Sequence, residues 1–340
     1  MTSTDYQLYE LGDFTLENGV VLPAARLAFK TFGTLSPARD NVVVIPGAFN
    51  GAVEEYDGWM APGMAIDPER YFVVVVGLFG NGQSSSPSNM PAPFDGPRFP
   101  MVTVADNVNA QYQMLTKEFG VTGIELVAGF SMGALQTFHW GAHHPELVRR
   151  IAPFCGAARC SRHNYVFLAS LKAAIETDQT FNGGDYEVLP RAGLSTFGRI
   201  YAGWAFSQAF YREKVDMEIM GFASVDDFLS GYWDTLFSER DANDLLLMVW
   251  TWQHADIAAG ARYGGDLQKA LAGITGRATV MPSETDLYFP VADNMLEVAA
   301  MPNARCVPIP SIWGHVAGAC GANPADTAFI DSQFRELLAS

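Results

Sequence analysis

Cysteine is scarce in this chain, and its scarcity limits the possible settings. The 340 residues include four cysteines, at positions 155, 160, 306 and 320, and none are spaced as CxxC. So few thiols in so long a chain argue against a disulfide-stabilised fold and against a cysteine-rich zinc site. The sequence therefore predicts a reduced, cytoplasmic setting.

Positive charge is also in short supply. Lys and Arg number 21 against 37 Asp and Glu, which gives a formal net charge of -16. An acidic surface repels both phosphate backbones and anionic lipid headgroups. We therefore expect neither nucleic acid nor membrane as a partner.

Long apolar runs are missing as well. The longest, such as YFVVVVGLFG at 71–80, are far shorter than the roughly 20 residues that span a bilayer. The first residues, MTSTDYQLYELGDF, have neither the basic nor the apolar region of a signal peptide. The overall composition, with 49% hydrophobic and 17% charged residues, is typical of a globular enzyme with a large core.

Two parts of the chain alternate short strands with helices. The expected strands are apolar runs, several of them rich in β-branched residues, and lie at 41–47, 71–77, 124–129, 149–156, 277–282 and 304–310. Helical periodicity follows at 104–119, 132–144, 291–301 and 324–338. This alternation predicts an α/β fold with a mostly parallel, doubly wound sheet. Between these parts, residues 161–273 lose the strand pattern and become helical and aromatic. We expect a core of residues 1–160 and 274–340, with a helical lid at 161–273.

One short motif carries a candidate nucleophile. Gly129-Phe130-Ser131-Met132-Gly133 follows an expected strand and precedes an expected helix. In a nucleophile elbow, small neighbours allow a turn so tight that the serine is exposed at the helix N-terminus. The Met132 amide would then point at a developing oxyanion. A serine between glycines can also simply mark a strand turning into a helix, but the flanking elements favour the elbow.

An elbow requires an acid and a histidine later in the chain, each after a strand. Asp286 and His315 meet that requirement, and Glu284 remains an alternative acid. His139 lies about 12 Å along the same helix from Ser131 and is excluded as the base. His139 and His143 have metal-ligand spacing but no evident acidic partner, so we expect a solvated helix face. The second oxyanion amide should come from PGAFNGAVEEYDGW after the first parallel strand, with Phe49 favoured and Ala48 second. An ordinary glycine turn is the alternative for that loop.

The chain resembles the homoserine O-acetyltransferase family of α/β hydrolases. The resemblance rests on LAFKTFGTLSPARDNVVVIPGAFNG, FPMVTVADNVNAQYQML, GFSMGALQTFHWGAHHPELVRRI, ERDANDLLL, and DLYFP followed by GH. It implies the α/β-hydrolase fold, a Ser131–Asp286–His315 triad, a helical lid, acetyl-enzyme chemistry and, commonly, a homodimer. Neither a metal nor an organic cofactor is implied.

The chain departs from that family where an amino-acid acceptor would be held. Val316 follows His315 in place of aspartate, and Glu239 and Leu245 replace an arginine and a tyrosine, with Arg240 one position off. Burying a zwitterion without these partners costs several kcal/mol. A pocket with Ala48, Leu245 and Val316 favours a neutral ester, so we expect an esterase for short-chain alkyl acetates such as ethyl acetate. The alternatives are an acetyl-CoA-dependent homoserine O-acetyltransferase and a non-catalytic binding protein of the same fold.

Overall fold

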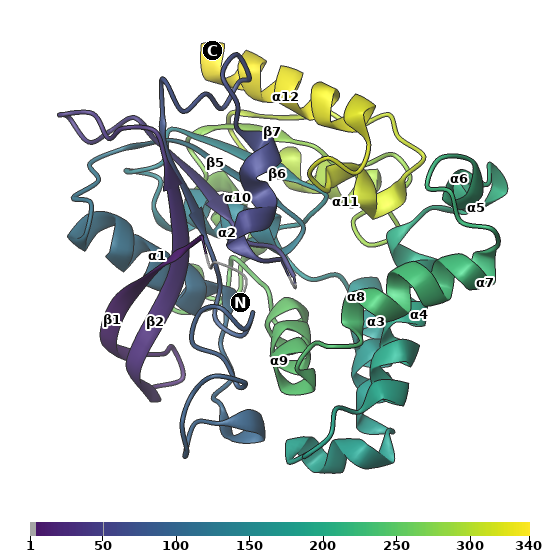
Figure 1. Ribbon diagram of the computed structural model, residues 1–340. Coiled ribbons are helices and arrows are strands. Elements are labelled where there is room, and N and C mark those ends of the chain that lie inside the picture. The colour runs from purple at the N-terminus through teal and green to yellow at the C-terminus, as the bar shows by residue number, and fades with distance from the viewer. Residues whose placement is uncertain (1–4, 50) are drawn as a thin grey trace.

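The computed structural model describes residues 5–49 and 51–340, and its centre is an eight-stranded sheet (Figure 1). The strand order is β1-β2-β4-β3-β5-β6-β7-β8. From β4 to β8 every neighbouring pair is parallel, whereas β1 and β2 are antiparallel to their neighbours. The strands are β1 Gln7–Thr15, β2 Val21–Phe32, β3 Val42–Pro46, β4 Phe72–Val76, β5 Ile124–Phe130, β6 Arg150–Phe154, β7 Arg277–Val280 and β8 Ala304–Cys306. The predicted mostly parallel α/β sheet is confirmed.

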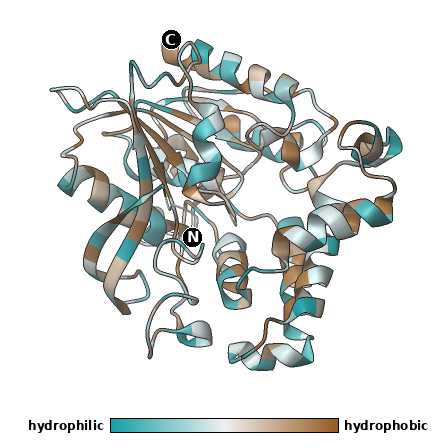
Figure 2. Cartoon of the chain, viewed as in Figure 1, coloured by the Kyte–Doolittle hydropathy of each residue, from teal (hydrophilic) through white to brown (hydrophobic). Residues whose placement is uncertain are grey.

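The parallel strands are buried because helices cover both faces of the sheet. Ile151 of β6 lies beneath Gly141 of α2 (Met132–His143), whereas Phe154 of the same strand contacts Phe334 of α12 (Pro324–Ala339). Residues of opposite parity in a strand point to opposite faces, so α2 and α12 lie on opposite sides. The apolar colouring of the central strands in Figure 2 agrees with this two-sided burial.

The remaining core helices begin and end close to the expected positions. Helix α1 spans Val104–Lys117, and Thr103 closes its N-terminus through a capping box with Asp106. Helix α11 spans Val291–Val298, and the short helices are η1 Val53–Trp59, η2 Gly96–Arg98 and η5 Gly314–Gly318.

The antiparallel pair β1–β2 was not among the predicted elements. Its pairing shifts register on both sides of Gly12, which has a positive φ of 71°. Such irregularities break the two-residue alternation that identifies a strand in a sequence.

Residues 161–273 contain helices and turns and contribute no strand to the sheet. The helices are α3 Arg162–Glu176, η3 Gln179–Gly184, α4 Arg191–Ala205, α5 Gln208–Arg212, α6 Val215–Glu218, α7 Val225–Phe228, η4 Leu229–Asp234, α8 Thr235–Phe237, α9 Ala242–Gln253 and α10 Leu267–Ala272. In Figure 1 helices α3 to α8 stand to one side of the sheet. The residues after α9 instead pack on the core, where the Tyr263 hydroxyl donates to the Ala142 carbonyl of α2.

Helix α4 ends against the loop that carries His315. A Cβ at Gly314 would lie 2.7 Å from both the Ala205 carbonyl oxygen and the Ser207 nitrogen, so only glycine allows this approach. The Ser207 hydroxyl donates to the Ile312 carbonyl across the same seam. The helical segment therefore rests directly on the histidine loop.

Candidate active site

The strand-to-helix turn at Ser131 has the strained geometry of a nucleophile elbow. Ser131 has φ 55° and ψ -120°, outside the regions that side-chain-bearing residues favour. A Cβ at Gly129 would lie 2.2 Å from the Gly133 carbonyl oxygen, and a Cβ at Gly133 would lie 2.4 Å from that of Pro46. Both glycines are thus required by the tightness of the turn, which places Ser131 at the N-terminus of α2.

Three side chains distant in sequence meet at this turn. His315 Nε2 lies 2.9 Å from Ser131 Oγ, and His315 Nδ1 lies 2.8 Å from Asp286 Oδ2. The serine, histidine and aspartate are 3%, 5% and 6% exposed, so water screens these contacts little. The Tyr288 amide donates to Asp286 Oδ1 at 2.7 Å, which fixes the carboxylate. The predicted residues therefore form one continuous hydrogen-bonded chain.

The alternative acid and the alternative histidines lie elsewhere. Glu284 is exposed, and only Asp286 of the two carboxylates bonds to His315. His139 is buried, with its ring stacked on that of His143 at 3.9 Å between centroids. The expected solvated helix face is therefore wrong for His139, because the segment after α9 covers this side of α2: His143, next to His139, contacts the Ile257 carbonyl and the Tyr263 ring. His254 is exposed and stacks on Trp250.

The loop after β3 is held close to the elbow. Gln136 of α2 donates from Nε2 to the Gly47 carbonyl at 2.8 Å. The Ala48 amide donates to the Tyr56 hydroxyl, so it is already engaged. This leaves Phe49 as the better candidate of the two predicted amides. Asn50 of this loop lies outside the described residues.

Aromatic rings join the Phe49 loop to His315. The Phe49 ring lies 6.2 Å from that of Trp252 and 5.8 Å from that of Tyr201. Trp252 in turn lies 5.6 Å from Tyr288, whose ring lies 4.5 Å from the imidazole of His315. We call these rings, with Phe167, the aromatic cage. Sequence reasoning identified the aromatic-rich helices, but not that the rings in contact with His315 come from Phe130, Tyr288 and Phe289 of the core.

The three predicted pocket residues occupy different surroundings. Ala48 is buried beside the Tyr56 hydroxyl, and Val316 is half-buried on η5 next to His315. Leu245 lines a cavity of about 240 Å³ together with Asp244. Burial raises the pKa of Asp244 to about 7, and its carboxylate accepts a 2.6 Å hydrogen bond from the Ser88 hydroxyl. This cavity is more polar than the expected apolar pocket.

The fold and the elbow agree with the comparison to known families, in which the family described as alpha/beta hydrolase fold matches residues 40–315. The chain belongs to the α/β-hydrolase family.

Curated relatives of this α/β hydrolase include esterases and acyltransferases. It is 35% identical to an ethyl acetate hydrolase of Pseudomonas veronii, over 98% of this chain and 96% of that protein. It is 30% identical to a homoserine O-acetyltransferase of Thermobifida fusca, over 88% and 86% of the two chains. Among solved structures, the acetyl esterase MekB superposes with a TM-score of 0.95 at 35% identity, covering 98% and 97%. The resemblance stated from the sequence is therefore confirmed.

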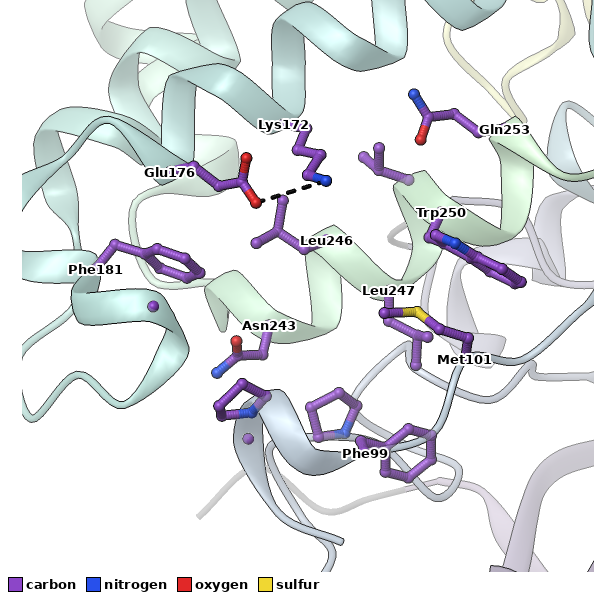
Figure 3. A pocket seen from close by; sticks show the side chains of 15 residues that line it. Phe99, Met101, Lys172, Glu176, Phe181, Asn243, Leu246, Leu247, Trp250 and Gln253 are labelled. Atoms are coloured by element: carbon purple, nitrogen blue, oxygen red, sulfur yellow. Dashed lines mark ion pairs between the residues drawn. The ribbon is translucent and has the colours of Figure 1, made fainter. Parts of the chain in front are cut away.

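A second cavity of this α/β hydrolase lies on the other side of α9 (Figure 3). It holds about 230 Å³ and is lined by residues that include Leu246, Trp250 and Phe181, with the Lys172–Glu176 ion pair at one wall. At 100° per residue, Leu246 and Trp250 fall on the face of α9 opposite Trp252. The helix therefore separates this cavity from the aromatic cage.

One group of potential metal ligands is present among residues 5–49 and 51–340. Atoms of Cys155, Asp286 and His315 lie within 4.8 Å of one another. Asp286 and His315 already bond each other, and burial raises the pKa of the Cys155 thiol well above its usual range. A thiol that resists deprotonation is a poor ligand, so this group does not fit a resident metal. In the same ranges, no helix has the length and apolar character needed to cross a bilayer.

Proposed function

We propose that this α/β hydrolase is a serine esterase that cleaves short-chain alkyl acetates, such as ethyl acetate, through an acetyl-serine intermediate. The observation that carries the proposal is the buried chain of hydrogen bonds from Ser131 through His315 to Asp286. The name of the Pseudomonas veronii relative, an ethyl acetate hydrolase, supports acetate as the acyl group.

The proposed first half-reaction acylates the serine. Ser131 Oγ attacks the ester carbonyl while His315 Nε2 accepts the hydroxyl proton. Asp286 keeps the proton of His315 on Nδ1 and stabilises the imidazolium that forms. The amides of Phe49 and Met132 donate to the oxyanion. When the tetrahedral intermediate collapses, the alkoxy group leaves and takes the proton from His315 Nε2.

The second half-reaction reverses these roles with water. His315 Nε2 accepts a proton from water as the water oxygen attacks the acetyl carbon. Collapse breaks the bond to Ser131 Oγ, which regains the proton, and acetate is released. No cofactor takes part in either half-reaction.

The choice of water over an amino-acid acceptor rests on charge. Glu239 replaces the arginine expected in a transferase, and it is exposed and paired with Arg191 at 2.7 Å. Val316, beside His315, offers no carboxylate to an ammonium group. A zwitterionic acceptor bound beside Val316 would thus lose its hydration without the partners that the transferases place there, whereas Arg240 and the carboxylates of this chain line the separate cavity beside Leu245. O-acetyl transfer is the alternative reaction, because the Thermobifida fusca relative is a homoserine O-acetyltransferase.

A direct comparison of the two reactions tests the proposal. The enzyme is given ethyl acetate in water, or acetyl-CoA with homoserine, and acetate and O-acetylhomoserine are measured. We expect ester hydrolysis to dominate and Ser131→Ala to lower it about 10³-fold or more. Faster formation of O-acetylhomoserine would refute the hydrolase assignment, and retained turnover in Ser131→Ala would refute the nucleophile.

We further propose that residues 161–273 act as a lid and that the enzyme works as a cytoplasmic homodimer. The four unpaired cysteines agree with a reducing compartment. Leu296 and Met295 of α11 are 72% and 59% exposed, which offers apolar surface for a second copy. Light scattering coupled to size exclusion measures the assembly, and a monomeric mass at micromolar concentration would contradict the dimer.

A further inference from the structure

Tyr288 is held rigidly against the catalytic histidine. Its ring meets the imidazole of His315 edge to face, at 4.5 Å and 69°. Its backbone amide donates to Asp286, and its carbonyl accepts a hydrogen bond from Asn164 of α3. Tyr288 is 1% exposed. Both the core and the helical segment therefore fix where its side chain lies.

The Tyr288 hydroxyl is buried but has no hydrogen-bond partner among the described residues, and the same holds for Trp252 Nε1. A buried donor left without a partner costs about 1–3 kcal/mol, so such groups are rare without a functional reason. Burial also raises the pKa of Tyr288 well above its usual value, so the hydroxyl remains a donor. Replacing Tyr288 by phenylalanine would retain the packing and remove this unpaired group.

Both donors belong to the aromatic cage, which contacts the catalytic histidine through the ring of Tyr288. The cage runs from Phe49, whose amide we assign to the oxyanion, through Trp252 and Tyr288 to His315. A substrate whose carbonyl oxygen faces Phe49 places its leaving oxygen toward His315 Nε2. The alkoxy side of the ester is then the part nearest Tyr288.

We propose that the Tyr288 hydroxyl is a further catalytic group, which donates a hydrogen bond to the alkoxy oxygen of the ester as the carbon–oxygen bond breaks. This inference rests on the proposed esterase function. Tyr288 keeps its proton throughout, and the proton that the leaving alcohol gains still comes from His315. A donor aimed at an atom that becomes negative lowers the barrier without transferring a proton. Trp252, whose ring lies 5.6 Å from that of Tyr288, offers its unpaired Nε1 as a second donor.

The chemistry of the leaving atom provides the test. Oxygen accepts hydrogen bonds well, whereas sulfur accepts them weakly. The hydroxyl should therefore assist cleavage of ethyl acetate much more than cleavage of S-ethyl thioacetate. Tyr288→Phe should lower kcat/KM for the oxygen ester about 10²-fold, mainly through kcat, and that for the thioester less than threefold. Trp252→Phe should show the same bias with a smaller loss.

Stability and control measurements distinguish this catalytic role from a purely structural role of the Tyr288 hydroxyl. Because Tyr288→Phe removes an unpaired buried donor, its Tm should stay equal to or above that of the wild type. Tyr165→Phe, at an exposed tyrosine of α3, is the matched control and should change neither rate. Equal losses on both substrates, or wild-type activity in Tyr288→Phe, would overturn the inference and leave the esterase function intact. A wild-type enzyme that cleaves neither substrate would overturn both.

Discussion

At the scale of single residues, position decides between two carboxylates that are two residues apart. The carboxylate of Asp286 bonds to His315. The side chain of Glu284 is exposed, and its backbone amide donates to the Ile309 carbonyl. The same chemical group is thus buried and bonded to His315 at one position and exposed to solvent at the other.

Asp286→Asn should lower kcat for ester hydrolysis about 10³- to 10⁴-fold, because the amide no longer holds the His315 proton on Nδ1. Steady-state kinetics on ethyl acetate measure the loss. Glu284→Gln is the matched control and should stay within twofold of the wild type. Comparable losses in the two variants would contradict the assignment of the acid.

Residue types and their order were sufficient to predict that Ser131, Asp286 and His315 lie within hydrogen-bonding distance of one another. The elbow, the aspartate and the histidine each follow a strand, and parallel strands bring such positions to one edge of the sheet. The cage was not predictable, because its rings come from the loop after β3, from α3, α4 and α9, and from the Asp286 loop. Only the packing of these helices determines which of their aromatic side chains join Tyr288 in the cage.

At the scale of elements, the elbow tolerates no side chain at Gly129. The added Cβ would meet the Gly133 carbonyl oxygen and Thr137 Oγ1, at 2.2 and 2.5 Å. The Gly133 carbonyl oxygen belongs to the backbone and cannot move without opening the first turn of α2. We expect Gly129→Ala to lower the free energy of unfolding by about 3 kcal/mol, and to abolish detectable ester hydrolysis.

Urea unfolding and ester hydrolysis measure these effects, and Gly203→Ala is the control. A Cβ at Gly203, in α4, meets nothing within 4 Å, so alanine should stabilise that helix by about 0.5–1 kcal/mol. Unchanged stability in Gly129→Ala would show that the turn is looser than its geometry indicates.

The C-terminal half of α2 and the residue after it carry histidines that are largely buried. Burial, with positive charge from Arg262 and the neighbouring histidines, lowers the pKa of His139 well below its usual value and that of His144 to about 4. The unfolded chain takes up protons below about pH 6.5, where the folded protein does not. Stability from these groups is therefore complete above pH 6.5 and is lost as the pH falls toward their folded pKa values.

Between pH 7.5 and pH 5, protonation of His139 in the unfolded chain should lower the free energy of unfolding by about 2 kcal/mol. His139→Leu should reduce the loss of stability over this interval by that amount, as measured by urea unfolding at both values. His163→Gln, at an exposed site of α3, should leave the loss of stability between the two pH values unchanged. An undiminished loss in His139→Leu would show that other groups govern acid unfolding.

Regular elements were predictable from sequence, and irregular ones were not. Strands β3 to β6 appear as short apolar runs because both of their faces are buried. The β1–β2 pair is interrupted at Gly12, and the helical segment contains a π-helical turn at Leu229–Asp234 between two short α-helices. In both places the local periodicity changes within a few residues, so no single pattern identifies the element.

At the scale of the whole molecule, the helical segment and the core share one site. Asn164 of α3 bonds to the Tyr288 carbonyl, and the end of α4 packs on Gly314. Trp252 of α9 completes the cage beside Tyr288. Any movement of this segment would therefore change the surroundings of the histidine directly.

The net charge of -16 acts on the whole molecule and should distinguish substrates by their own charge. A neutral ester such as ethyl acetate feels no long-range field, so its kcat/KM should vary less than twofold between about 10 and 150 mM salt. An anionic acetate ester, O-acetylglycolate, is repelled by the acidic surface, and the cavity beside Leu245 is lined by three carboxylates against one arginine, Arg240. Shortening the screening length from about 30 to 8 Å should raise its kcat/KM severalfold.

Initial rates on the two esters are measured at matched pH, with Tm recorded at each salt concentration to verify that the fold is unchanged. Equal salt dependence for the two esters would show that salt acts on the protein itself, and not on the approach of the substrate.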